Sequence, residues 1–251
     1  MKKYTILMYN FGNYEIMREP EEMDPECEYI YVTDDPNCKS DKWKVIYEKN
    51  DMPSVFDKCY SVRFNLFKYA TTDVCIYMDA SIQLHKSMRK LYDAFMESRA
   101  DVGLNIHPLR YDLEEEYHVW EQCRGYSRWN TFKCLNYMKR AGYDLSYKGL
   151  YQGTCRICKR TPLNKSLDEL TLKVLKDLSV DGKIERQDQN IYSFVINHFY
   201  PDMKIFPFSQ QVLQSEYATW CGHNSKIPNP VLKENDEPKY VRNKLTELYH
   251  I

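Results

Sequence analysis

The first hundred residues alternate short apolar runs with polar turns and amphipathic segments. The apolar, β-prone runs predict strands at 4–9, 28–33, 43–47, 74–78 and 101–106. Apolar positions at helical spacing predict a helix from Ser54 to about Tyr69 and a second helix capped by Ser87. Strands that alternate with helices indicate an α/β fold, with a mostly parallel sheet flanked by helices. The unbroken apolar run at 74–78 is typical of a strand buried on both faces.

The second half of the sequence is richer in helical patterns. Residues 113–140 form one long helix or two helices that break near Gly125, and 151–160 read as a strand. Ser166 is expected to cap a leucine-rich helix, and another helix should follow Asp188. Prolines and aromatic residues in 201–230 indicate surface loops around a site.

No glycine- or serine-rich linker and no internal repeat separates the two halves. We therefore expect a single domain over 1–251. Within it, a nucleotide-binding side would span about 1–108 and an acceptor side about 109–230. The segment 231–251 would be a C-terminal helical tail, because its apolar residues fall on one helical face.

Composition narrows the class of protein. The 251-residue chain has 35 basic and 36 acidic residues and a net charge of −1, which argues against a general nucleic-acid binder. No run approaches the ~20 apolar residues of a membrane span. The short apolar run at 4–9 ends at Asn10, which favours a first strand over a signal peptide and predicts a cytoplasmic protein.

The cysteines do not indicate a disulfide framework or a zinc site. Nine cysteines are an odd number, and most lie in apolar segments, as buried reduced thiols do. Cys155 and Cys158 form a Cys-x-x-Cys pair inside a predicted strand, but a structural zinc site needs four ligands and no second pair occurs.

Asp79, at the end of the 74–78 strand, is the leading candidate for chemistry. Ligands of open α/β sheets bind beyond the carboxyl ends of the strands. A carboxylate there can hold a ribose hydroxyl, or a divalent metal beside a diphosphate; the alternative is an aspartate that caps a turn. Gly12, after the first strand, would let backbone approach a ligand, although neither a dinucleotide fingerprint nor a P-loop is present.

Two other strand ends carry polar candidates. Asp34 could accept hydrogen bonds from a base or ribose. Alternatively, it could stabilise a turn, because Asp-Asp-Pro-Asn is a turn-forming sequence. His107 follows the 101–106 strand, and Arg110 beside it could bind phosphate. The glutamates at 114–116 more simply complement a helix dipole.

Taken together, these segments resemble GT-A-fold glycosyltransferases. Tyr-Met-Asp-Ala-Ser-Ile at 77–82 is similar to their Asp-x-Asp element. The pattern is most similar to the glycosyltransferase-like domain family of plant mucilage-related proteins and bacterial polysaccharide loci. More distantly, it is similar to glycogenin-like transferases. The matching segments run from about 4 to 200: 9–14, 32–35, 77–82, His107-Pro108 with Arg110, and 186–189.

The resemblance implies a nucleoside diphosphate sugar donor and a set of contacts to it. Gly12 and Asn13 would lie near the nucleotide, Asp34 near the base, and Asp79 near the ribose and diphosphate. Asp188 would contact the acceptor hydroxyl or the donor sugar, and an inverting enzyme would use such an acid as its base. The alternative for Asp188 is a helix cap.

The sequence departs from the pattern of the metal-dependent glycosyltransferases at one position, and this position affects how the diphosphate would be neutralised. Ser81 stands where metal-dependent relatives carry a second acid. Mg²⁺ or Mn²⁺ could still bind through Asp79 and the diphosphate, with His223 as a further ligand and Lys226 nearby, as in glycogenin-like enzymes. Alternatively, Arg63 or Lys68 would neutralise the charge; as ordinary helix residues they would simply be solvated.

These expectations define a glycosyltransferase that transfers a hexosyl-type sugar to a glycan or lipid-linked acceptor in polysaccharide biosynthesis. A non-catalytic nucleotide-sugar or glycan-binding protein is the first alternative, because Ser81 removes a carboxylate. A hydrolase using Asp79 and Asp188 on metal-bound water is the second. The basic segment 239–245 could rest weakly on an anionic membrane surface or dock on its own domain.

Overall fold

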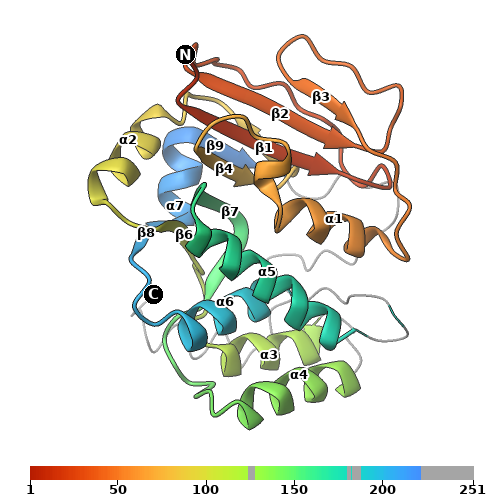
Figure 1. Ribbon diagram of the computed structural model, residues 1–251, viewed down its shortest axis with the longest axis vertical. Coiled ribbons are helices and arrows are strands. Elements are labelled where there is room, and N and C mark those ends of the chain that lie inside the picture. Colours follow the sequence, from red (N-terminus) through yellow and green to blue (C-terminus); the bar gives the residue numbers. More distant parts are fainter. Residues whose placement is uncertain (124–127, 180–181, 183–187, 222–251) are drawn as a thin grey trace.

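The computed structural model describes the chain except for residues 124–127, 180–181, 183–187 and 222–251 (Figure 1). Its centre is a seven-stranded sheet in the order β3-β2-β1-β4-β7-β6-β8. In chain order, the strands are β1 (Tyr4–Asn10), β2 (Cys27–Thr33), β3 (Lys44–Tyr47), β4 (Val74–Met78), β6 (Val102–Ile106), β7 (Tyr151–Lys159) and β8 (Ile205–Ser209). β7 runs antiparallel to β4 and β6, and the remaining pairs are parallel. The mostly parallel sheet confirms the predicted α/β class.

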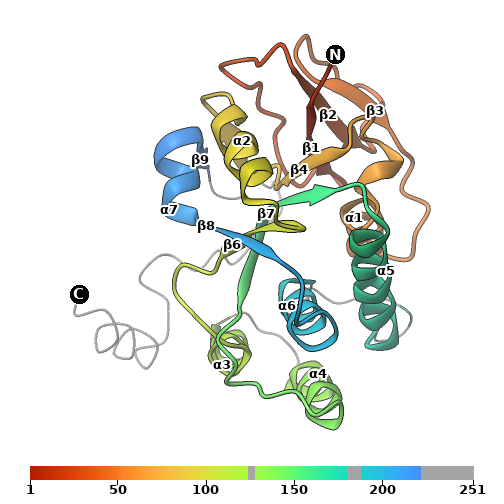
Figure 2. The ribbon, with the colours of Figure 1, turned by 60° about the vertical axis from the view of Figure 1, so that its left-hand side comes forward.

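Helices cover both faces of this sheet (Figure 2). The helices are α1 (Val55–Arg63), α2 (Arg89–Ser98), α3 (Leu113–Cys123), α4 (Arg128–Arg140), α5 (Pro162–Asp177), α6 (Asp188–Phe199) and the short α7 (Gln210–Val212). A 3₁₀ turn spans Leu66–Lys68, and a π-helical turn spans Leu213–Tyr217. β5 (Ile82–Leu84) and β9 (Ala218–Trp220) pair as a separate antiparallel ribbon.

Two hydrophobic cores form because the central strands are apolar on both faces. Leu7 and Tyr77 point into the core under α1, α5 and α6, whereas their neighbours Ile6 and Met78 point into the core under α2. All four side chains are buried, as expected of parallel strands covered on both sides. The sheet therefore fixes which strand ends meet at its carboxyl edge.

The predicted strands agree closely with the observed ones, whereas two helix boundaries were wrong. Ser54 does cap α1, because its Oγ accepts from the Asp57 N–H at 3.1 Å. The helix nevertheless ends at Arg63, since Asn65 adopts φ −150° and breaks the helical ladder before the 3₁₀ turn. α5 is capped by Thr161 and not by Ser166, because the Thr161 hydroxyl accepts from the Asn164 N–H and Pro162 fits the first turn.

Three further segments were only partly predicted. Residues 113–140 form two helices, α3 and α4, which selects the second of the two alternatives. Ser87 lies just before α2, where its Oγ accepts from the Arg89 N–H at 3.1 Å. The described part of 201–230 is more regular than the predicted loops, because it contains β8, α7 and β9. The predicted tail, 231–251, lies outside the described residues.

Candidate functional site

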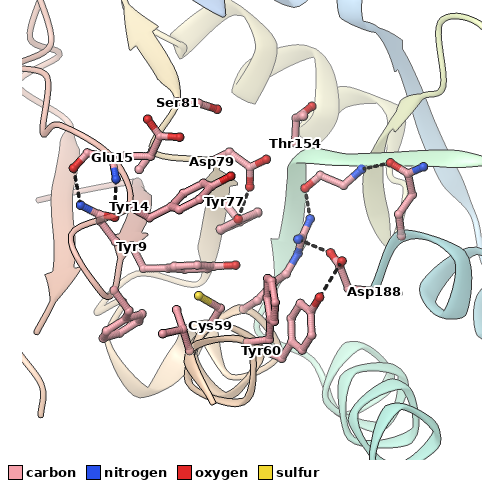
Figure 3. Close-up of a pocket in the computed structure, with 18 of the residues that line it drawn as sticks. Tyr9, Tyr14, Glu15, Cys59, Tyr60, Tyr77, Asp79, Ser81, Thr154 and Asp188 are labelled. Carbon is pink, nitrogen blue, oxygen red and sulfur yellow. Dashed lines mark hydrogen bonds and ion pairs between the residues drawn. The ribbon is translucent and has the colours of Figure 1, made fainter. Parts of the chain in front are cut away.

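A cavity of about 480 Å³ opens at the carboxyl ends of β1 and β4 and the adjacent start of β7 (Figure 3). Parallel strands present their ligand-binding loops at this edge, so the position agrees with the general rule for open α/β sheets. Five of the predicted site residues line this cavity: Gly12, Arg63, Asp79, Ser81 and Asp188. They come from segments up to 176 positions apart, and the sheet order brings them together.

Asp79 is held at the centre of the cavity wall. Its backbone N–H donates to the Thr154 carbonyl at 2.9 Å, which fixes the turn after β4 to the first residues of β7. The Tyr77 hydroxyl, two residues earlier, donates to the Asp79 carboxylate. Burial and the nearby Asp79 charge raise the pKa of Tyr77, so this phenol stays protonated as a donor. Ser81 is 3% exposed and lies above Asp79 in the same wall (Figure 3).

Arg63 and Asp188 form a buried ion pair, and Asp188 lies across the cavity from Ser81 (Figure 3). Asp188 opens α6, and its second oxygen accepts from the Tyr60 hydroxyl at 3.0 Å. Arg63 ends α1 and lies over the Tyr77 ring at 4.8 Å. Burial alone would lower the pKa of Arg63, but the Asp188 carboxylate raises it well above its usual value. Both carboxylate oxygens of Asp188 therefore have partners, which makes it a poor general base.

Glycine at position 153 is required for this arrangement. Arg63 donates to the Gly153 carbonyl, and a Cβ at this position would lie 2.5 Å from Arg63 Nη2. The Gly153 N–H donates to Gln189 Oε1 at 3.1 Å, which ties β7 to the first turn of α6. The backbone at Gly153 therefore holds both the cavity wall and the Arg63–Asp188 ion pair in place.

The loop after β1 is held in one conformation by hydrogen bonds to Asp34. Gly12 and Asn13 have φ of +67° and +53°, the left-handed region that glycine and asparagine tolerate best. The Gly12 N–H donates to both carboxylate oxygens of Asp34, at 3.0 and 3.1 Å. Asp34 thus holds the loop in place, and neither Asn13 nor Asp34 is among the residues that line the cavity.

Besides Asn13 and Asp34, three further predicted donor-binding residues lie away from the cavity lining: Lys68, His107 and Arg110. Lys68 is half exposed and pairs with Glu48 at 2.7 Å, because the helix break after Arg63 turns it outward. His107 Nδ1 accepts from the backbone N–H of Arg110 at 3.0 Å, and Arg110 pairs with the buried Glu116. This buried network braces the loop before α3, and a hydrogen bond from Gln189 to Glu116 at 2.9 Å connects it to the cavity lining.

Residues 9–14 were predicted as a site segment, but the stacking role of their aromatic side chains was not. Tyr9 stacks on Tyr77 at 5.4 Å and on Phe11 at 5.9 Å, and Phe56 is 41% exposed at the α1 side. The alternation of β1 places Tyr9 on the same face as Leu7, a signal that could have marked it as site-facing. Glu15 was also missed: its backbone exchanges two hydrogen bonds with the Asn10 side chain, which folds the loop back against the cavity.

A metal site is not formed by the described residues alone. In the part of the chain that the structure covers, no group of three or more histidine, cysteine or acidic residues could hold an ion. The Asp79 carboxylate and the Ser81 hydroxyl are nevertheless oxygen donors of the kind Mg²⁺ and Mn²⁺ prefer. His223 and Lys226, predicted to complete the site, lie outside the described residues.

No family model and no curated protein matches the sequence. Among solved structures, the chain is similar to the apo form of mouse xyloside xylosyltransferase 1. The TM-score is 0.47 and the identity 13%, with 82% of this chain and 85% of that chain covered. Such values are too low to transfer an activity or a site residue. No helix among the described residues has the length and apolar character needed to cross a bilayer.

Proposed function

We propose that the protein is a GT-A-like glycosyltransferase that uses a nucleoside diphosphate sugar. The observation that carries this proposal is the cavity itself: Asp79 at the end of β4 faces it, and the Arg63–Asp188 pair closes its far wall. The predicted division into a nucleotide side over 1–108 and an acceptor side over 109–230 is consistent with this cavity, since both contribute to its lining.

In the proposed binding mode, the donor lies along the carboxyl edge of the sheet. The base would lie beside β1, near Gly12 and the aromatic rings of Tyr9 and Phe11. The ribose and diphosphate would meet Asp79 at β4, and the sugar would reach β7. Neighbouring strands are ~4.8 Å apart, so β1 and β7 are about 10 Å apart, a span suited to an extended donor of this kind. The experiment described below identifies the nucleotide and the sugar of the donor.

Catalysis would depend on orientation and charge stabilisation. A Mg²⁺ or Mn²⁺ ion held by Asp79 would neutralise charge on the departing diphosphate. Tyr77 would orient Asp79 through its hydroxyl, and Arg63 would present a fixed positive charge whose position Asp188 sets. Asp188 is thus proposed as a positioning residue, because Arg63 and Tyr60 occupy its oxygens.

The acceptor is proposed to be a glycan or a lipid-linked glycan in polysaccharide synthesis. The decisive experiment incubates the purified chain with single nucleoside diphosphate sugars, with and without Mn²⁺ and glycan acceptors. Release of nucleoside diphosphate that requires an acceptor supports transfer. Release to water at the same rate supports a hydrolase, and saturable binding without turnover supports a binding protein.

A further inference from the structure

The β7 side of the cavity carries a cluster of uncharged hydrogen-bonding side chains. Gln152 and Thr154 are two residues apart on β7, so their side chains share one face of the strand, opposite the face on which Gly153 meets Arg63. Behind them lie Asn105, at the end of β6, and Gln210, at the start of α7; both are buried. These four residues are called the amide cluster below.

Asn105 fixes the cluster from behind. Its side-chain nitrogen lies 3.0 Å from Gln152 Oε1, 3.1 Å from Thr154 Oγ1 and 2.5 Å from Gln210 Oε1. The Gln152 carbonyl is therefore turned toward the protein. Its Nε2 group donates no hydrogen bond to any described residue and stands at the cavity wall as a neutral donor. A rigid, unoccupied amide donor in a cavity is suited to a hydroxyl oxygen of a ligand.

The charges that line the cavity disfavour an acidic group on the sugar, whereas the diphosphate would be neutralised by Arg63 and by a metal ion held by Asp79. Three carboxylates line the cavity: Glu15, Asp79 and Asp188. Arg63 is the one lysine, arginine or histidine among the described lining residues, and Asp188 holds it. A further carboxylate on the ligand would therefore meet negative charge, and in the described lining it would find no cation that is not already paired.

We propose that the donor carries an uncharged sugar, and that the Gln152 carboxamide, oriented by Asn105, binds one of its hydroxyl groups. This inference rests on the proposed function, because it places the donor sugar at β7. Neutral hexoses, pentoses and N-acetylhexosamines fit the site. Uronic acids and other acidic sugars are rejected by repulsion from the lining carboxylates.

The test compares matched donors that differ in one group. UDP-glucose and UDP-glucuronate, UDP-galactose and UDP-galacturonate, and GDP-mannose and GDP-mannuronate differ only at C6, as a hydroxymethyl group or a carboxylate. Binding is measured by isothermal titration calorimetry with Mn²⁺ present, and turnover by release of the nucleoside diphosphate. We expect the neutral member of the best pair to be preferred at least about tenfold, the effect of one like-charge contact in a partly hydrated site.

Two variants separate the effect of a charge at position 152 from a general charge effect. Gln152→Arg places a cation at the cavity wall and should reduce the neutral-over-acidic preference about tenfold or more. Gln211→Arg makes the same charge change at an exposed position of α7 outside the lining and should leave the preference unchanged. An equal neutral-over-acidic preference in both variants would contradict the placement of the donor sugar beside position 152.

The remaining outcomes distinguish a failure of the inferred sugar preference from a failure of the proposed function. If an acidic donor is preferred by the unmodified protein, the inference is overturned while the glycosyltransferase proposal stands. If neither member of any pair binds or is turned over, the proposed function fails and the inference falls with it. A neutral preference that Gln152→Arg alone weakens supports both.

Discussion

Gly153→Ala tests whether the Arg63–Asp188 pair depends on the missing side chain at position 153. The added methyl group would lie 2.5 Å from Arg63 Nη2, 3.3 Å from its Cζ and 3.4 Å from Asp188 Oδ2. The first distance is shorter than any stable contact, so the guanidinium has to move. Gly153 lies in a β-strand and has no positive φ, so the backbone itself accepts alanine.

The cost can be bounded from the contacts that Arg63 loses. Losing the hydrogen bond to the Gly153 carbonyl alone costs about 2 kcal/mol, because the donor is charged. If the ion pair with Asp188 also breaks, the cost rises to about 3–5 kcal/mol, since a buried charge loses its partner. We therefore expect the free energy of unfolding to fall by about 2–5 kcal/mol, and donor affinity to fall with it.

A double-mutant cycle supplies the control. Unfolding by urea is measured for Gly153→Ala, Arg63→Ala and the double variant. In the Arg63→Ala background, the atom that the methyl group displaces is absent, so Gly153→Ala should cost less than about 0.5 kcal/mol. An equal loss of stability in both backgrounds would refute the reasoning, because the strain would then lie elsewhere.

Three further predictions address the surroundings of the cavity. Tyr77→Phe keeps the ring under Arg63 but removes the hydrogen bond to Asp79; steady-state kinetics should show kcat/KM reduced about 5–15-fold, and an unchanged value would exclude the orienting role. Lys68→Ala should leave donor affinity unchanged in calorimetry and stability within about 0.5 kcal/mol, because Lys68 is half exposed and lies outside the lining; a marked loss of affinity would restore its predicted role. Burial opposes ionisation of Glu48, but hydrogen bonds from Lys68, Tyr69 and Lys58 lower its pKa to about 2. The stability it contributes is present above its unfolded pKa of 4.5 and is lost as pH falls toward 2, so the difference between wild type and Glu48→Gln in urea unfolding should shrink over that range and stay constant from pH 6 to 8.

The strands were predictable because each is a short, nearly unbroken apolar run between turn-forming residues. Val74–Met78 is the clearest case, and its position also identified Asp79 as a residue at the ligand edge. The helix ends were harder to predict. Nothing in the apolar spacing of 54–69 shows that the chain breaks at Asn65, and that break directs Arg63 into the cavity but Lys68 out of it.

The pairing of side chains within the site could not be predicted from a single sequence. Arg63 and Asp188 are 125 positions apart, and their contact depends on the sheet order that places β7 beside β4. The contact between Gly12 and Asp34 was equally unpredictable. Each residue was a plausible ligand contact by itself, but in the structure the Gly12 N–H donates to the Asp34 carboxylate. No sequence pattern marks Gly153 as a site residue, because the requirement for glycine comes from Arg63, which is distant in the sequence.

Donor binding to the wild-type chain and to Asp79→Asn tests most directly whether Asp79 lies in a nucleoside diphosphate sugar site. Thermal unfolding is followed with a panel of nucleoside diphosphate sugars at 1 mM with Mn²⁺. A donor present at about 100 times its Kd stabilises the protein by ~2.7 kcal/mol, a rise in Tm of roughly 5–10 °C for a chain of this size. We expect such a rise for at least one donor with wild type and its loss in Asp79→Asn, whose Tm without donor stays close to that of wild type. A rise of equal size in both proteins, or in neither, would contradict the placement of the donor at Asp79.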